Sequence, residues 1–566
     1  MVSLMANSHN SVAFDAKLFE KAKKEHKMIV MDLEAVWCHW CHVMDKTTYQ
    51  DKKVLELLEK HFIFVKVDHD ARPDLAQRYR EYGWPATIFF DENGQEIVKR
   101  SGYISPQYMA NLLQAIVDDP SPEEKNKKIN KKLSNTSFLS KTLKQELLKR
   151  HQSSYDKKLG GLKLSQKYLE ADSIDYTLHQ ASQGDKEAKK RAIKTLDASI
   201  KLIDPVWGGA YQYSTHGDWN HAHYEKIMRM QTRYIKIYAL ASKLFNSPKY
   251  LNASKKVAQY VFRFLKNDEG AFYVSQDADL EQGKKAHNYF KYNNEKRVSL
   301  GIPKVDKHLY GSSQGGMIEA LVYLYEASNE KEYLESALKS AQWTLNNRLV
   351  QGGGIAHDES RKLLYLEDNI AVGKGFLALY RSTGEVRWLS QASQLGKFMR
   401  KYFKAPDAGI LTSTDNGTPI KPLRVLDENI QSARFFNLLA HYTGKKYHAT
   451  FAKHIMRYLT NEAVALSSIT EAGILSCDYE FNHSPLHLTV NGDKNNIQTK
   501  ALKKIALKNA PWYSRIDLID LNRAKAYNKD IDYPQLNKPA SFICTDNRCS
   551  LPLFTVVEFQ EAINKF

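Results

Sequence analysis

The stretch that decides the fold is Trp37-Cys38-His39-Trp40-Cys41-His42, which follows the mostly apolar run 29–33. Two of the five cysteines lie here, in a Cys-x-x-Cys motif placed where a buried strand passes into a helix. A sulfur at a helix N-terminus is stabilised as a thiolate by unpaired N–H groups and by the helix dipole. The pattern therefore predicts a redox dithiol in which Cys38 attacks and Cys41 resolves.

Three other chemistries fit the same letters. Cys-x-x-Cys-His also matches covalent haem attachment, Cys and His are metal-ligand types, and the cysteines could simply be packed and inert. The surrounding order favours the dithiol, because it runs strand, Cys-x-x-Cys helix, strand, helix, a strand pair introduced by Trp84-Pro85, and helix. That is a thioredoxin-like plan, in which a cis-proline faces the dithiol. We expect Trp84 and Pro85 to present the substrate disulfide, with no metal and no cofactor beyond a Cys38–Cys41 disulfide.

The polar residues around the motif have separate expected roles. Asp32 stands alone in an apolar strand, where a buried carboxylate is costly unless it takes part in proton transfer. The alternative is a hydrogen-bonded aspartate at a strand end. Protonated His39 and His42 would lower the pKa of Cys38. A lowered thiol pKa favours an oxidant or isomerase over a reductant, although the sequence leaves the direction open.

Composition narrows the class of protein. The 566 residues leave room for two to four domains. The net charge of +18 comes from lysine runs such as 21–24 and 125–128, which are typical of solvated helix faces and lack the aromatic residues of a nucleic-acid site. No apolar run approaches the roughly 20 residues that span a bilayer. The first ten residues show no secretion signal, which predicts a cytoplasmic protein, or an exported one if residues 2–6 end a truncated signal.

The rest of the chain divides by texture into further units. We expect a thioredoxin-like domain over 1–118, a polar linker over 119–137, a helical domain over 138–480 and a small α/β unit over 481–566. Glycine turns at 160, 208, 270, 353, 409 and 473 separate the helices of the long domain. Such repetition indicates helical hairpins, either in a closed (α/α)6 toroid or in an open solenoid. The expected helices are roughly 138–153, 172–183, 187–203, 224–245, 249–266, 313–328, 331–348, 369–382, 386–402, 428–443 and 447–464.

The tail has a different pattern again. Strands are expected over 486–490, 516–521 and 540–544, with a helix over 495–508 between the first two. Cys544 and Cys549 either close a short loop, hold a metal with help from elsewhere, or stay unpaired.

The densest polar and aromatic stretch of the helical domain runs from Trp207 to Lys226. It contains Tyr211, Trp219, His223 and Glu225, and such aromatic faces and polar groups are typical of sugar sites. His223 and Glu225 are spaced so that one acts as a base while the other orients. The alternative is a loop-to-helix junction with capping and packing roles.

Three further carboxylates are candidates for the same site. Asp277 and Asp279 stand at strand spacing, as a pair that could do acid–base chemistry on a sugar. Asp368 opens a later helix. Each also has an ordinary interpretation as a turn residue or a helix cap.

The whole pattern resembles the thioredoxin-domain family typified by spermatogenesis-associated protein 20, also called the DUF255 family. The resemblance covers nearly the whole length, and it implies a thioredoxin-like domain followed by a toroid similar to six-hairpin glycosidases and sugar 2-epimerases. The family is described as a possible redox regulator. The motifs that carry the resemblance are 37–44, 66–68, 72–74, 83–85, 208–209, Trp219, 223–226, 277–279, Asp368, Cys544, Cys549 and Pro552.

We therefore expect a thiol–disulfide oxidoreductase-like protein that acts on protein thiols and disulfides, with a toroid that binds a carbohydrate or a glycosylated partner. The alternatives are a sugar epimerase, isomerase or glycosidase in the toroid cleft, and a non-catalytic scaffold.

Overall fold

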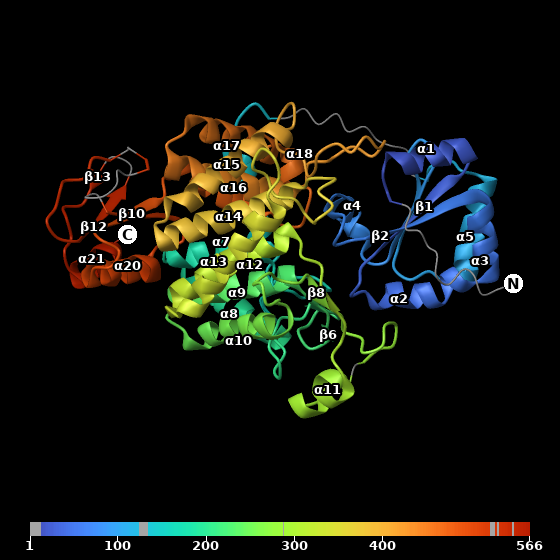
Figure 1. The fold of residues 1–566 in the computed structure, drawn as a ribbon, viewed down its shortest axis with the longest axis horizontal. Coiled ribbons are helices and arrows are strands. Elements are labelled where there is room, and N and C mark those ends of the chain that lie inside the picture. Colours follow the sequence, from blue (N-terminus) through green and yellow to red (C-terminus); the bar gives the residue numbers. More distant parts are fainter. Residues whose placement is uncertain are drawn as a thin grey trace.

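The computed structural model describes residues 13–123, 134–286, 288–520, 527–528, 531–545 and 548–565. The toroid lies between an N-terminal and a C-terminal α/β unit (Figure 1). Much of the expected linker, the lysine run 125–128, the first ten residues and the end of the expected strand 516–521 lie outside the described residues.

The N-terminal unit is built on a four-stranded sheet in the order β2-β1-β3-β4. Its strands are β1 (Met28–Glu34), β2 (Phe62–Asp68), β3 (Ala86–Phe90) and β4 (Glu96–Ser101). β1 runs parallel to β2 and antiparallel to β3, and β3 is antiparallel to β4. The central strand β1 leads into α2 (His39–Lys46), so the sheet delivers the Cys-x-x-Cys motif to a helix start, as in a thioredoxin-like fold.

Side chains along β1 alternate between the two faces of the sheet and so contribute to two separate hydrophobic clusters. Ile29, Met31 and Leu33 pack with α1 (Ala16–Glu25) and with α4 (Pro73–Arg78). Val30 packs on the other face with α3 (Lys52–His61) and α5 (Pro106–Asp118). Because side chains two residues apart share a face, Asp32 points to the same side as Val30.

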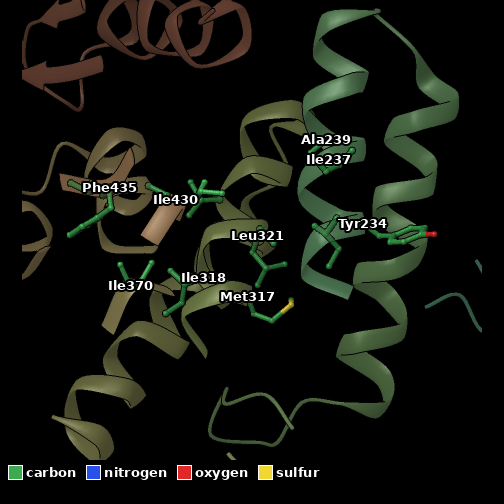
Figure 2. Packing of buried hydrophobic residues seen from close by; sticks show 14 of the residues in the cluster. Tyr234, Ile237, Ala239, Met317, Ile318, Leu321, Ile370, Ile430 and Phe435 are labelled. Carbon is green, nitrogen blue, oxygen red and sulfur yellow. The ribbon is translucent and has the colours of Figure 1, made fainter. Parts of the chain in front are cut away.

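Six helices form the inner wall of the toroid in the described part of the chain. They are α7 (Ala171–Ser182), α9 (Met228–Leu244), α12 (Gly311–Ser328), α14 (Leu366–Thr383), α16 (Leu426–Thr443) and α19 (Ala472–Asn482). Each packs on the next, and α19 packs back on α7, so the ring is closed and is not an open solenoid. Figure 2 shows apolar side chains of α9, α12, α14 and α16 meeting between these helices.

An outer helix backs each inner one. The outer set is α8 (Lys186–Ser199), α10 (Pro248–Phe264), α13 (Lys331–Arg348), α15 (Val386–Tyr402), α17 (Lys446–Leu459) and α6 (Lys141–Ser153). The first outer helix, α6, packs on the last inner one, α19, so the two ends of the toroid chain form its closing hairpin. The sequence-based assignment missed α19 because Gly473 was assigned to a turn, whereas it lies inside this helix.

The C-terminal unit repeats the connectivity of the N-terminal sheet. Its strands β10 (Leu486–Asn491), β11 (Ser514–Ile519), β12 (Ala540–Thr545) and β13 (Arg548–Cys549) lie in the order β11-β10-β12-β13. β10 is parallel to β11 and antiparallel to β12, and β12 is antiparallel to β13. α20 (Ile497–Asn509) and α21 (Val556–Ile563) pack on one face. The chain therefore carries the same strand–helix plan at both ends.

Both α/β units are joined to the toroid by polar contacts. His357 Nε2 lies 2.8 Å from the carbonyl oxygen of Asp70, and the buried Asp368 carboxylate lies 3.0 Å from His357 Nδ1. On the other side, the Tyr380 hydroxyl donates to Asp517 of β11 over 2.5 Å. Among the described residues, no helix is long and apolar enough to cross a membrane.

Candidate functional site

The dithiol lies at the start of α2. Cys38 is the N-cap residue, and its Sγ accepts a hydrogen bond from the Cys41 backbone N–H over 3.2 Å. The two sulfurs form a disulfide of 2.04 Å. Cys38 is 5% exposed and Cys41 is 1% exposed. In the reduced state the same N–H would stabilise a Cys38 thiolate, which makes Cys38 the better nucleophile of the pair.

Aromatic residues of the N-terminal unit form one wall beside the sulfurs. The Trp84–Pro85 peptide bond is cis. The Trp84 and Trp37 ring centroids are 5.1 Å apart, and Trp37 Nε1 donates to Asp70 Oδ2 over 2.7 Å. Ile227 of the toroid packs on the same small cluster as Trp37 and both cysteines. The toroid therefore covers part of the surface around the dithiol.

Asp32 is fully buried on the face of β1 that it shares with Val30. Burial, reinforced by the nearby Glu34 carboxylate, raises the pKa of Asp32 well above its usual value. The Tyr49 hydroxyl is close enough for the two groups to interact, and burial raises the pKa of Tyr49 as well. An aspartic acid with a raised pKa can hold a proton at neutral pH and pass it on.

Two toroid carboxylates reach across to the histidines of the motif. Asp279 Oδ2 lies 2.5 Å from His39 Nδ1, and Asp277 Oδ2 lies 3.5 Å from His42 Nε2. The Asp279 backbone N–H donates to Asp277 Oδ1 over 3.0 Å, which fixes the two carboxylates relative to each other. Burial alone would lower the pKa of His42, but Asp277 outweighs it and the pKa is raised. The carboxylates are thus paired with the dithiol motif. The His39–Asp279 pair spans 240 residues, so no local pattern of the sequence predicts it.

A cavity of about 150 Å³ opens between the two units at this point. Cys38, His39, Trp40 and Trp84 line one side of it. The toroid supplies the opposite side, which includes Gln212, Tyr213, His223, Glu225, Asp279 and Lys285. Gln212 and Tyr213 belong to the expected stretch from Trp207 to Lys226, whereas Lys285 was not among the expected site residues.

Glu225 and His223 lie side by side in the toroid wall of this cavity. His223 is in β6 (Ala222–His223), and its Nδ1 lies 4.0 Å from Glu225 Oε2, while its ring stacks on Tyr213 with centroids 4.4 Å apart. Glu225 is 7% exposed, and its Oε2 has no hydrogen-bond partner among the described residues. Burial, with a further contribution from Asp277 and Asp279, raises the pKa of Glu225 to about 7.

Four of the expected toroid residues do not line the cavity, and one of them is Asp277, which faces His42. Tyr211 is buried and packs edge-on against Tyr224 and Phe290. Trp219 is buried and donates from Nε1 to the Leu159 carbonyl over 3.0 Å. Asp368 is inside α14, where it accepts from the Ser312 backbone N–H and contacts His357. These side chains pack in the toroid or hold the N-terminal unit against it. The expected site residues therefore do not form a single cluster.

The fold and the dithiol together define a class: a thioredoxin-like α/β unit, with an N-capping cysteine in a Cys-x-x-Cys disulfide, joined to an (α/α)6 toroid and a second small α/β unit. Residues 3–136 match a family described as "Protein of unknown function, DUF255". This N-terminal region is therefore similar to the DUF255 family of thioredoxin-like proteins.

Several relatives and solved structures are similar to parts of this chain. Spermatogenesis-associated protein 20 of Rattus norvegicus is 25% identical over 315 residues, which are 49% of this chain and 40% of that protein. The chain thus spans less than half the length of that relative. A thioredoxin H-type of Fagopyrum esculentum is 40% identical over 86 residues, covering 15% of this chain and 68% of that protein. A solved D-mannose isomerase covers 60% of this chain and 97% of its own with a TM-score of 0.46 and 14% identity.

Proposed function

We propose that this protein is a thiol–disulfide oxidoreductase whose active dithiol is Cys38 and Cys41. The observation that carries the proposal is the position of Cys38: it caps α2, accepts the Cys41 N–H, and lines a cavity beside the Trp84–Pro85 bond. The 40% identity to a thioredoxin supports the same chemistry over this part of the chain. No metal and no organic cofactor is needed for it.

The exchange proceeds in two balanced steps. In the first, the Cys38 thiolate attacks a substrate disulfide, a Cys38–substrate disulfide forms, and the second substrate sulfur leaves as a thiolate that takes up a proton. In the second, ionised Asp32 accepts the proton of Cys41, and the Cys41 sulfur attacks Cys38. The Cys38–substrate bond breaks, and the first substrate sulfur leaves as a thiolate that takes up the proton held by Asp32. The substrate gains two electrons and the protein is left with the Cys38–Cys41 disulfide. An external dithiol then reduces it, and the reverse sequence oxidises a dithiol substrate.

The toroid has a different part in this proposal. It supplies the second wall of the cavity and pairs His39 and His42 with Asp279 and Asp277. Acting through the histidines, these carboxylates orient the motif and are positioning residues. The active site is therefore formed by residues of both the N-terminal unit and the toroid.

Carbohydrate binding is a second candidate function for the same cavity. The feature that favours it is the side-by-side placement of Tyr213, His223, Glu225 and Asp279, which offers an aromatic face with carboxylates and an imidazole. On this hypothesis an aldose or disaccharide is bound or isomerised, and His223→Ala stops the change in an NMR screen of sugars. Unchanged spectra for every sugar tested would exclude it.

The oxidoreductase proposal is tested by trapping. Cys41→Ser leaves Cys38 able to attack but removes the resolving sulfur, so a mixed disulfide with the substrate should accumulate and be visible by intact-mass spectrometry after mixing with a disulfide. Cys38→Ser should accumulate none, and Cys477→Ser, which changes a buried thiol far along the chain, should behave as wild type. Equal adduct formation by Cys38→Ser and Cys41→Ser would contradict the assigned roles.

A further inference from the structure

An unsatisfied buried oxygen marks the toroid wall opposite Cys38. Glu225 Oε2 has no hydrogen-bond partner among the described residues, although the side chain is more than nine-tenths buried and lines the cavity. A buried acceptor without a partner costs free energy, and native proteins normally provide a donor for it. Glu225 lines the cavity, so a donor that enters the cavity reaches this side chain.

The charges around this oxygen define what donor fits. Asp277 and Asp279 lie close enough to raise the pKa of Glu225, and both are already engaged by His42 and His39. Lys285 lines the same cavity, but its Nζ lies 4.8 Å from the Trp40 ring centroid, on the side of the N-terminal unit. Asp277 and Asp279 are held by histidines of the motif, and Glu225 Oε2 lies 4.0 Å from His223 Nδ1, beyond hydrogen-bond distance. A site with these three carboxylates attracts a positively charged donor and repels an anion.

The size of the space limits what can carry that donor. A cavity of about 150 Å³ is small beside the roughly 300–1,000 Å³ of drug-sized pockets. Gly283 of the loop that follows Asp279 lies against the backbone of His42, and Lys46 Nζ donates to the Gln282 carbonyl over 2.6 Å. The loop therefore lies over the first turns of α2, and the group entering beside Cys38 must be compact.

We propose that Glu225 is a specificity-determining residue that binds the ammonium group of an aminothiol-type disulfide while Cys38 attacks its sulfur. The inference rests on the proposed oxidoreductase function and names the substrate class of that same site. The substrate half in the cavity is a short chain with a sulfur at one end and an ammonium at the other. Its ammonium donates to Glu225 Oε2, and the sulfur bonded to it points to Cys38 in the first exchange step.

The test compares four small disulfides with the full-length reduced protein and dithiothreitol as reductant. Cystamine carries an ammonium, cystine an ammonium and a carboxylate, bis(2-hydroxyethyl) disulfide is neutral, and dithiodiglycolate is anionic. Charge-assisted hydrogen bonds predict that kcat/KM for cystamine exceeds that for the neutral disulfide by about tenfold or more, with the anion slowest. The cystine arm shows whether Lys285 accommodates a carboxylate.

Glu225→Gln should reduce the ratio of kcat/KM for cystamine to kcat/KM for the neutral disulfide to near unity. Glu281→Gln is the matched control, because Glu281 lies two residues after Asp279 but is exposed and paired with Lys284. The preference of the wild type should also grow as the pH rises through about 7, with Glu225 ionising beside His223, Asp277, Asp279 and Tyr213.

The outcomes separate the two proposals. If wild type exchanges none of the four disulfides faster than a Cys38→Ser control, the oxidoreductase proposal fails. If it exchanges all four but with no preference for cystamine, the function stands and the role of Glu225 is overturned. The wild-type ratio decides the matter even where Glu225→Gln does not fold.

Discussion

The two four-stranded sheets of this chain share one connectivity but place their cysteines differently. In the N-terminal sheet, Cys38 and Cys41 follow the central strand β1 and open a helix. In the C-terminal sheet, Cys544 and Cys549 face each other across the β12–β13 pair, where they form a disulfide of 2.08 Å. The sequence left a loop closure, a metal site and free thiols open for this second pair, and the structure shows a disulfide.

The helix that follows the central strand explains the difference. The first turn of α20 is capped by Asn496, whose side chain accepts from the Gln498 and Thr499 N–H groups. In α2 the corresponding cap is the Cys38 sulfur itself. An oxygen cap satisfies the helix and is inert, whereas a sulfur cap is both stabilised and reactive. The reactivity of a disulfide therefore depends on its place in the fold. The shared sheet topology alone does not make a disulfide reactive.

The largest expected effect is that of Asp32, the buried carboxyl group of the strand that leads into the motif. β10 contains no Asp or Glu, whereas β1 carries Asp32. Asp32→Asn removes the proton acceptor for Cys41, so resolution of a mixed disulfide should slow by about tenfold or more. Attack by Cys38, followed as adduct formation in a Cys41→Ser background, should change much less. Equal slowing of both steps would show that Asp32 acts on the structure of the site and not on proton transfer.

The same substitution has a predicted effect on stability. Because the folded state raises the pKa of Asp32, its contribution to stability is fully present below the unfolded pKa of about 3.9 and is lost as the pH rises through the folded pKa. Asp32→Asn should therefore be more stable than wild type at neutral pH, by about 1 kcal/mol or more, and the difference should vanish near pH 4. Urea unfolding at both pH values gives this comparison.

The contacts of the two α/β units with the toroid are expected to respond to pH in opposite directions. The N-terminal contact weakens as the pH rises, and the C-terminal contact weakens as the pH falls. Burial would lower the pKa of His357, but Asp368 raises it to about 9, so its stabilisation is complete below about pH 6.5 and lost as the pH rises to about 9. Asp517, beside Arg515, has a pKa lowered to about 2 despite its burial, so its contribution is lost only as the pH falls from about 3.9 toward 2.

His357→Gln should thus cost about 1–3 kcal/mol of unfolding free energy at pH 6 and little above pH 9. Unfolding followed by tryptophan fluorescence at pH 6, 8 and 9.5 measures the difference, since Trp37 and Trp84 lie near the interface. His483→Gln, a change at a more exposed histidine of the toroid end, serves as control. If the unfolding free energies of wild type and His357→Gln change equally with pH, His357 is not the contact that is lost at alkaline pH.

The sequence predicted what depends on local pattern. The Cys-x-x-Cys helix start, the order of the N-terminal strands and the helical hairpins follow from hydrophobic periodicity and from the placement of glycine and proline, without knowledge of long-range packing. Gly473 was misassigned because a glycine inside a helix has the same local signature as a turn. The partners of Asp277 and Asp279 were missed because ion pairs across units are fixed by docking, which no single segment encodes.

The burial of individual site residues could not be predicted from the sequence either. Trp219 and Tyr211 have the residue types of a sugar site, but their neighbours bury them, and only the assembled toroid shows which aromatic side chains face the cavity. The second thioredoxin-type connectivity was not predicted either, because β13 is two residues long and α21 lies beyond the strands that pattern alone detects.

The central claim is that Cys38 and Cys41 form the exchanging pair and Cys544 and Cys549 a resting cross-link. Differential alkylation tests it directly: the protein is equilibrated with graded ratios of reduced to oxidised dithiothreitol, free thiols are blocked with one reagent and released thiols with another, and each cysteine peptide is quantified by mass spectrometry. We predict that Cys38 and Cys41 open together while Cys544 and Cys549 stay bonded at the same ratios. Opening of the C-terminal pair first, with Cys38 and Cys41 still bonded, would contradict the account.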